Sequence, residues 1–411
     1  MFGIYEMKPV YLPIETTKRE LYGKTALALS LCQLGCTVYL GSKQEVGRLA
    51  RNIGGGVYVD KGFHDGVSQG VYSDLMKNDT KVVVLDEENA VDFSDFQQLH
   101  QRFPAAIFDL VSTIYLWGVT QYNELHARHG DVVAHRALVT GHPRFELLLP
   151  EYQDLYVDET QQYKNRFGDF ILINTNFGLG NNIKPSRQVA KTYGSRFPQL
   201  QELMKYQADQ VKNFIELALA VKRATPFNVV IRPHPEENEL PYIVGTDSVE
   251  GIFVEKKGSA IPAILASKAM IHHDCTTALE CAMLGRDSLA YLSDHDPSLT
   301  TEIPTRISLV ATSIHELIAL LSTDMHAGDH INHDILEKYF SFPYASTAKV
   351  AADVARLTSK AKREMWGTFL YLIGNNMSQV KSILSAISKE DTPNVMMKKL
   401  SSSIILLSDM I

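Results

Sequence analysis

Short runs of aliphatic and β-branched residues alternate with helical patterns along the first 150 residues of the chain. Because these runs are apolar at consecutive positions, they are typical of strands buried on both faces of a parallel sheet. We predict strands at residues 10–14, 37–40, 82–85, 113–117 and 137–140, and helices at residues 18–34 and 121–128. This alternation predicts a Rossmann-like α/β domain over residues 1–150.

A second series of the same kind follows a polar, proline-punctuated segment at residues 149–165, which we interpret as the crossing between two domains. We predict strands at residues 170–173, 228–231, 252–254, 269–271 and 288–292, and helices at residues 198–223, 261–267 and 276–284. From about residue 313 the pattern is helical. The predicted fold class is α/β, with a second Rossmann-like parallel-sheet domain over residues 165–390 that ends in C-terminal helices.

Composition narrows the classes of function that this chain can have. Its 411 residues exceed one ordinary core and fit two domains of roughly 150–200 residues each. A formal net charge of −7 argues against nucleic acid as a partner, because nucleic-acid-binding proteins normally carry a broad basic face. An anionic ligand would therefore need a local pocket of cationic side chains and backbone N–H groups.

The four cysteines form no CxxC pair and no zinc-ligand spacing, so we expect reduced thiols in a cytoplasmic protein. No secretory signal opens the chain, and no apolar run approaches the ~20 residues of a membrane-spanning helix. The tail at residues 398–411 combines lysines and serines with a short apolar run. It fits a terminal helix packed on its own domain, or peripheral contact with a membrane surface or a partner helix.

The sharpest local pattern is Arg232-Pro233-His234-Pro235, which directly follows a predicted strand. Open α/β sheets bind ligands at this carboxyl edge, and the two prolines stiffen the turn. Arg232 offers a planar fork for phosphate oxygens, and His234 offers a second donor. The alternative is a rigid loop with an ion pair between Arg232 and Glu236 or Glu237.

A second pattern begins with His272, where another predicted strand stops, and continues into a helix that begins near Thr276. The hydroxyls of Thr276 and Thr277, with exposed N–H groups at the helix start, predict an anion site. Glu280 lies one turn further along and is placed to reach a ribose hydroxyl. The alternatives are a plain helix cap and a zinc site, but no third and fourth zinc ligands stand at suitable spacing.

A third cluster contains Asn174 and Asn176, again just after a predicted strand. Their amides offer hydrogen bonds to a ligand bound at the same sheet edge as Arg232. An ordinary turn without a ligand explains the cluster equally well.

In the first domain the candidate chemistry is the acidic run Asp86-Glu87-Glu88, which follows an apolar strand. Crowded carboxylates raise one another's pKa, which suits a general base or a nucleophile beside a cationic transition state. The alternative is a solvated acidic turn. Other strand ends of this domain add candidate groups for the acceptor side of a cleft: Glu15, Lys18, Arg19, His142 and Arg144.

Several of these segments, in this order, resemble a known family. The segments are 10–15 (VYLPIE), 18–20 (KRE), 85–88 (LDEE), 117–118 (WG), 140–145 (TGHPRF) and 174–177 (NTNF). They resemble the bacterial surface-carbohydrate biosynthesis proteins, which are similar to the retaining β-Kdo transferases of lipopolysaccharide O-antigen and capsule assembly. The resemblance covers about residues 9–290; Asn89 and His142 stand where glycine and asparagine are expected.

The resemblance implies a GT-B fold, in which two Rossmann-like domains face a central cleft, with no catalytic metal and no cofactor. It implies CMP-β-Kdo as the donor substrate, bound mainly through the residues already singled out in the second domain: Arg232, His234, His272, Thr276, Thr277 and Glu280. It further implies a carboxylate nucleophile that forms a glycosyl-enzyme, for which Asp86, Glu87 and Glu88 are the candidates. The implied partner is a glycan or glycolipid acceptor, used in the cytoplasm or at the inner-membrane surface.

Two other functions fit the same residues. The chain could transfer another group from a cytidine nucleotide, such as sialic acid or glycerol phosphate, because the phosphate-binding residues suit both reactions. It could also be a non-catalytic module of carbohydrate assembly with a degenerate cleft.

Overall fold

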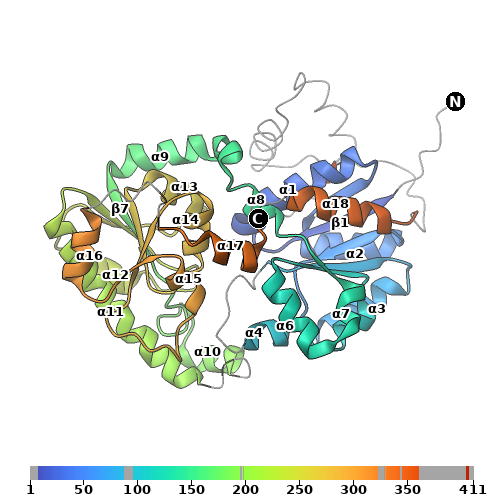
Figure 1. The fold of residues 1–411 in the computed structure, drawn as a ribbon, viewed down its shortest axis with the longest axis horizontal. Coiled ribbons are helices and arrows are strands. Elements are labelled where there is room, and N and C mark those ends of the chain that lie inside the picture. Colours follow the sequence, from blue (N-terminus) through green and yellow to red (C-terminus); the bar gives the residue numbers. More distant parts are fainter. Residues whose placement is uncertain are drawn as a thin grey trace. The chain divides into compact units, whose positions relative to one another are not determined.

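The computed structural model describes residues 8–87, 96–194, 197, 199–322, 328, 330–342, 345–360 and 404–406. The chain forms two compact units, each built on one parallel sheet (Figure 1). The first unit comprises the described residues of Met1–Ala90, Leu99–Leu155 and Leu336–Ile411, and the second comprises those of Val91–Gln98 and Tyr156–Ile335. The predicted α/β class with two Rossmann-like units is therefore confirmed.

The first unit has a seven-stranded sheet in the order β13-β2-β1-β3-β4-β5-β6. Its strands are β1 (Pro9–Ile14), β2 (Thr37–Ser42), β3 (Val57–Asp60), β4 (Lys81–Leu85), β5 (Thr113–Leu116), β6 (Ala137–Val139) and β13 (Ile404–Leu406). The five strands predicted for this half are present, together with β3 and β13, which were not predicted. Strand β3 has only four residues and follows three glycines, so its hydrophobic run is too short to stand out.

Helices of the first unit come from both ends of the described chain (Figure 1). They are α1 (Thr17–Gln33), α2 (Lys43–Ile53), α3 (Ser68–Met76), α4 (Gln97–Arg102), α5 (Ile107–Leu110), α6 (Val119–His129), α7 (Asp131–Arg136), α8 (Pro143–Glu146), α17 (His333–Phe340) and α18 (Ser346–Leu357). Helix α18 packs against α1 and α8. Its buried Asp353 carboxylate accepts hydrogen bonds from Thr113 (3.0 Å) and Tyr115 (2.8 Å) on β5. The described chain after Ile335 therefore completes the first unit, whereas the hydrophobic pattern predicts residues 165–390 as part of the second.

The second unit has a six-stranded sheet in the order β12-β11-β10-β7-β8-β9. Its strands are β7 (Phe170–Asn174), β8 (Asn228–Arg232), β9 (Ile252–Val254), β10 (Ala269–His272), β11 (Ser288–Tyr291) and β12 (Leu309–Ala311). Its helices are α9 (Val157–Phe167), α10 (Ser186–Tyr193), α11 (Leu200–Ala224), α12 (Leu240–Thr246), α13 (Ala260–Ala266), α14 (Thr277–Met283), α15 (Glu302–Arg306) and α16 (Ile314–Leu321). The predicted crossing at residues 149–165 is a short 3-10 helix, Pro150–Tyr156, followed by α9.

The core of the second unit lies between its sheet and helix α11. Phe214, Leu217 and Val221 recur along one face of α11 and are fully buried against Val229 and Ile231 of β8. This 3.6-residue period is the pattern from which the long helix was predicted. The packing holds the strands in fixed register, and that register places the residues discussed below.

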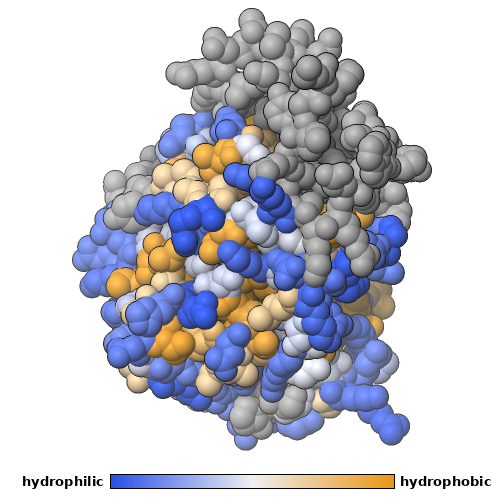
Figure 2. Space-filling view, turned by 90° about the vertical axis from the view of Figure 1, so that its right-hand side faces the viewer, coloured by the Kyte–Doolittle hydropathy of each residue, from blue (hydrophilic) through white to orange (hydrophobic). Residues whose placement is uncertain are grey.

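None of the described helices is both long enough and apolar enough to cross a membrane. Figure 2 shows hydrophobic residues interspersed with hydrophilic ones on one face of the molecule. Scattered apolar residues of this kind are ordinary on protein surfaces.

Gly56 is a position where backbone conformation and close packing both require glycine. Its φ is +69°, and a Cβ added there would lie 2.0 Å from the carbonyl oxygen of Pro9. We expect Gly56→Ala to destabilise the protein by at least about 2 kcal/mol, because left-handed strain of ~1–2 kcal/mol adds to a backbone clash. Urea unfolding measures this loss.

Gly66→Ala is the matched control. Gly66 has a similar φ of +76°, but a Cβ there would meet no atom within 4 Å. We expect it to cost only the ~1 kcal/mol of backbone strain. Equal losses in the two variants would contradict a role for packing at Gly56.

Candidate active site

Three adjacent strands of the second unit end in one row. Asn174 of β7 is in register with Arg232 of β8 on one side and with His272 of β10 on the other. The chain runs from β7 to β8 and β9 on one side, and returns on the other side as β10. The carboxyl edge between β7 and β10 is thus the topological switch point, where open α/β sheets bind ligands.

Asn174 lies at this switch point and is 2% exposed. Its Nδ2 donates to Thr277 Oγ1 (3.1 Å), and the Thr277 hydroxyl donates in turn to Cys275 Sγ (3.2 Å). Among the described residues, Asn174 Oδ1 has no hydrogen-bond partner. An acceptor oxygen without a partner suits a ligand that presents a hydroxyl or amino donor.

Arg232 is positioned differently from the expectation for a phosphate ligand. Its guanidinium donates to the carbonyl oxygens of Lys257 (2.7 Å) and Gly258, and to the Tyr163 hydroxyl (3.3 Å). The ion pair to Glu236 or Glu237 is not formed among the described residues. Arg232 therefore fastens the loop before α13, and a direct phosphate contact by this residue remains a prediction.

His234 is partly exposed, and its ring is oriented by the main chain. Its Nδ1 accepts a hydrogen bond from the Glu236 N–H (3.2 Å). A neutral imidazole must then carry its proton on Nε2. His234 can therefore donate a hydrogen bond from Nε2, and its contact with a phosphate stays a prediction.

The two adjacent histidines differ from the expected ligand-binding arrangement. His272 is fully buried, its Nε2 contacts Ser308 Oγ (2.9 Å), and burial beside His273 lowers its pKa to about 3. His273 lies between Tyr206 Oη (2.7 Å from Nε2) and the Tyr291 carbonyl oxygen (2.9 Å from Nδ1). A neutral, buried His272 offers no charge to a phosphate, so the geometry does not favour its predicted role.

The remaining predicted donor-binding residues lie on the same edge. Thr276 is exposed at the start of α14 and makes no side-chain cap, while Asn176 and Glu280 are partly exposed. The Asp274 carboxylate accepts a hydrogen bond from the Thr301 N–H (3.1 Å). The contacts of Thr276, Asn176 and Glu280 with a ligand stay predictions.

In the first unit the chain runs from β1 to β2 on one side and then crosses to β3, so its switch point lies between β1 and β3. Glu15 follows β1 there, and its Oε2 is 3.1 Å from Lys61 Nζ and 3.5 Å from Lys43 Nζ. Burial tends to raise the pKa of Glu15, but Lys61 and Lys43 outweigh it and lower the pKa below its usual value. The half-exposed Glu15 is therefore a charged group at the predicted acceptor site.

Asp86 and Glu87 follow β4 and are both buried, at 1% and 2% exposure. Arg102 Nε donates to Asp86 Oδ2 (2.7 Å), and Arg102 Nη2 bonds Asp86 Oδ1, so a guanidinium occupies both Asp86 oxygens. Glu87 Oε1 is 3.9 Å from Lys24 Nζ, and Glu87 Oε2 is 3.4 Å from His142 Nε2. Glu88 lies outside the described residues.

Burial raises the pKa of Glu87 to about 7, against the lowering effect of the Lys24 and Arg144 charges. Burial, with the charges of Arg144 and Lys24, lowers the pKa of His142 well below its ordinary value. His142 Nδ1 accepts from the Arg144 N–H (3.1 Å) at the start of α8, so neutral His142 carries its proton on Nε2, toward Glu87. Glu87 can therefore exchange a proton near neutral pH, which is the property of an acid–base group.

The other candidate cations lie near this cluster. The Arg144 guanidinium lies over the rings of Phe145 (4.6 Å) and Trp117 (5.8 Å). The Arg19 guanidinium nitrogen Nη2 is 3.7 Å from Glu20 Oε1. The side chain of Lys18 is outside the described part of the structure.

Sequence reasoning missed several residues of both edges: Lys24, Lys43, Asp60, Lys61, Arg102 and Glu237. Lys61 follows the missed strand β3, so no predicted strand end pointed to it. Lys24 lies in an apolar helical stretch, where a single lysine is usually an exposed residue. Its burial depends on Glu87 and His142, which are distant in sequence.

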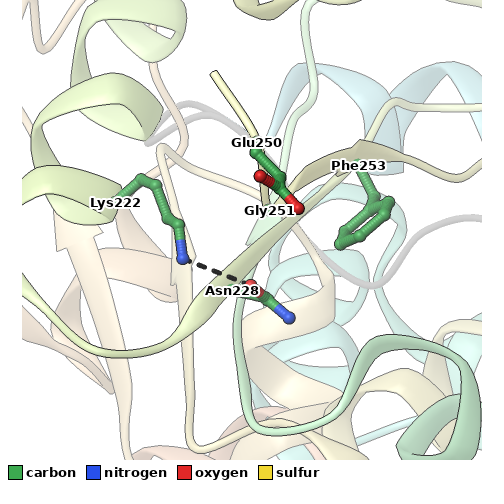
Figure 3. Close-up of a pocket in the computed structure, with 5 residues that line it drawn as sticks. All are labelled: Lys222, Asn228, Glu250, Gly251 and Phe253. Carbon is green, nitrogen blue, oxygen red and sulfur yellow. Dashed lines mark hydrogen bonds between the residues drawn. The ribbon is translucent and has the colours of Figure 1, made fainter.

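Metal binding finds no support in the described residues, since no group of three His, Cys, Asp or Glu side chains is placed to hold an ion. A hollow of about 390 Å³ lies elsewhere in the second unit, where Lys222, Asn228, Glu250, Gly251 and Phe253 line it (Figure 3). Asn228 begins β8 and Gly251 precedes β9, so this hollow is at the amino ends of the strands. It is therefore at the opposite edge from the predicted ligand site.

Two Rossmann-like units with these strand orders define the GT-B fold class. Among solved structures, the wall teichoic acid polymerase TagF, as an H444N variant soaked with CDPG, is similar with a TM-score of 0.55 and 8% identity. That likeness covers 86% of this chain and 88% of TagF. The UDP-GlcNAc 2-epimerase of Methanocaldococcus jannaschii is similar with a TM-score of 0.52 and 11% identity, over 85% of this chain and 99% of the epimerase. No protein-family model and no curated protein sequence matches this chain.

Proposed function

We propose that this chain is a retaining glycosyltransferase that transfers Kdo from CMP-β-Kdo to a glycan or glycolipid acceptor of a bacterial surface polysaccharide. The observation that carries the proposal is the switch point of the second unit. There Asn174 ends β7, the His234 turn follows β8, and Thr277 begins the helix that follows β10; each offers a hydrogen-bonding group. The motifs shared with the β-Kdo transferases support the choice of sugar, and the cytoplasmic face of the inner membrane is the proposed place of action.

The chemistry follows from the groups at the two edges. CMP leaves with its phosphate, and the neutral His234 donates a hydrogen bond from Nε2 to the departing oxygen. A carboxylate at the end of β4 attacks the anomeric carbon as the bond from that carbon to the CMP phosphate oxygen breaks. The acceptor hydroxyl then attacks the same carbon and gives its proton to water while the bond to the carboxylate breaks, so two inversions retain the configuration. Glu15, flanked by Lys43 and Lys61, is proposed to bind the acceptor.

A second candidate is the transfer of glycerol phosphate from a cytidine nucleotide. The fold likeness to TagF, a wall teichoic acid polymerase whose variant was soaked with CDPG, favours this alternative. It uses the same edge of the second unit, but it requires no carboxylate nucleophile at β4. The two candidates therefore differ in the first unit and share the nucleotide.

Thermal unfolding with CMP, CDP, UDP and GDP tests the donor assignment. A nucleotide that binds the folded state stabilises it by about 2.7 kcal/mol when its free concentration is 100 times its Kd. We expect CMP to raise the unfolding temperature more than UDP or GDP does. Stabilisation by UDP alone would overturn the cytidine donor, and no stabilisation by any nucleotide would favour a non-catalytic module.

A further inference from the structure

Glu237 directly follows the Arg232–Glu236 turn and has no exposed surface. Its side chain lies between two loops at the carboxyl edge of the second unit's sheet, one after β7 and one after β8. No step of the proposed reaction uses this carboxylate. A buried carboxylate needs a compensating environment, so its partners show what it does.

Four hydrogen-bond donors face the Glu237 carboxylate. Its Oε1 accepts from Thr175 Oγ1 (2.7 Å), from the Phe177 N–H (3.0 Å) and from the His234 N–H (3.0 Å). Its Oε2 accepts from the Tyr242 hydroxyl of α12 (2.6 Å). A carboxylate only accepts, so it satisfies all four donors. A glutamine amide would turn its NH₂ toward the Tyr242 hydroxyl, and its neutral oxygen would hold the three Oε1 donors more weakly than a charged carboxylate does.

The two oxygens have different partners. All three bonds of Oε1 go to the loops that carry candidate ligand-binding groups: Thr175 and Phe177 flank Asn176, and His234 is the proposed donor. Oε2 accepts from Tyr242 of α12, whose hydroxyl also interacts with Thr175 and Asn181 of the loop after β7. Since strand pairing between β7 and β8 ends at Asn174 and Arg232, Oε1 connects the two loops beyond the end of that ladder.

The backbone of Glu237 is fixed independently of its carboxylate. Lys256 Nζ donates to the Glu237 carbonyl oxygen (2.5 Å), and an antiparallel bridge pairs Glu237 with Asn182. The carboxylate therefore projects from a fixed backbone position and lies between the loops that follow β7 and β8. A group held in this way sets a distance between the elements that it joins.

We propose that Glu237 is a positioning residue of the nucleotide site, whose Oε1 holds the Asn176 loop and the His234 turn at the spacing that binds one phosphate group. This rests on the proposed function, which assigns a cytidine nucleotide to this edge. Glu237 itself does not touch the ligand. It acts through the main-chain N–H groups of Phe177 and His234.

The test compares Glu237→Gln with Tyr242→Phe in the full chain. Tyr242→Phe removes a buried hydrogen bond to Oε2, but it leaves all three bonds of Oε1 in place. It therefore removes one buried hydrogen bond from the same carboxylate while the Thr175, Phe177 and His234 donors to Oε1 are retained. CMP affinity is measured by calorimetry, stability by urea unfolding, and donor KM and kcat with CMP-Kdo.

We expect Glu237→Gln to weaken CMP binding about tenfold and to raise the donor KM by a similar factor, with kcat changed less than about threefold. Tyr242→Phe should change the CMP Kd less than about twofold at a comparable loss of stability. Thr175→Val removes only one of the three Oε1 bonds, and it should weaken CMP binding about threefold. This variant keeps the comparison informative if Glu237→Gln does not fold.

Equal weakening by Glu237→Gln and Tyr242→Phe would overturn the proposal, because the carboxylate would then act through stability alone. Unchanged CMP affinity in Glu237→Gln and in Thr175→Val would overturn it as well. Nucleotide binding by the parent protein tests the proposed donor separately. If the parent protein binds UDP but not CMP, the variants are compared by their UDP affinity instead. A parent protein that binds none of the four nucleotides removes the site and the positioning role together.

Discussion

Replacing Glu87 with glutamine is expected to lower the rate of Kdo transfer at least about 10³-fold, the size of loss seen when a catalytic group that acts in the transition state is removed. Of the two described carboxylates at the end of β4, Asp86 has both oxygens bonded to Arg102. Glu87 Oε2 forms no hydrogen bond among the described residues and lies 3.4 Å from His142 Nε2, so it is held less tightly than the two oxygens of Asp86. Single-turnover transfer from CMP-Kdo measures the rate.

Asp86→Asn and Glu88→Gln are the comparison variants, because the three acidic residues are consecutive in the chain. We expect smaller losses in both, and a covalent Kdo adduct that disappears only in Glu87→Gln. An adduct that survives in Glu87→Gln and is lost in one of the other two would move the nucleophile to that residue. The glycosyl-enzyme is detected by mass spectrometry of the intact protein.

The buried Glu87 is also expected to make folding stability depend on pH. Its pKa is about 7 in the folded protein and 4.5 without the protein environment. Above pH 4.5 the unfolded chain loses the proton while the folded state keeps it, so stability falls as pH rises toward 7. A shift of this size corresponds to about 3 kcal/mol.

Glu87→Gln lacks this titration. Between pH 4.5 and 7.5 the free energy of unfolding of the parent should fall by about 3 kcal/mol relative to that of Glu87→Gln. Urea unfolding at several pH values, followed by circular dichroism, gives both curves. In Lys24→Met the pKa of Glu87 should rise further, since the opposing positive charge is gone, and the window should extend to higher pH. Parallel curves for the parent and Glu87→Gln would exclude a raised pKa.

The sequence was most informative where long apolar strands end in polar residues. Residues 170–173, 228–231 and 269–271 were predicted as strands, so the edge that carries Asn174, His234 and Thr277 could be located from the hydrophobic pattern alone. The strand register in the structure places Asn174, Arg232 and His272 side by side in one row. The parallel-sheet rule alone does not give that alignment.

The roles of Arg232, His272 and Lys24 could not be predicted, because no pattern in the sequence identifies the groups that they contact in the fold. Arg232 is held by two backbone carbonyls, and His272 by Ser308. Neither partner stands at a spacing that identifies it, so both residues looked available for a phosphate. The role of Lys24 depends on Glu87 and His142, which are distant in sequence and lie near it only in the folded protein.

The return of the chain to the first unit has a consequence for the order of events during protein synthesis. The described residues of Tyr156–Ile335 in the second unit are nearly continuous in sequence, so they can fold as soon as they leave the ribosome. The first unit, by contrast, cannot fold completely when its first 155 residues have emerged. Asp353, whose carboxylate accepts hydrogen bonds from Thr113 and Tyr115, has not yet been synthesised. Synthesis of the chain from residue 155 to residue 353, at roughly 5–20 residues per second, takes about 10–40 s. Thr113 and Tyr115 lack their hydrogen-bond acceptor during that time. The N-terminal half of the molecule is therefore the last to be completed.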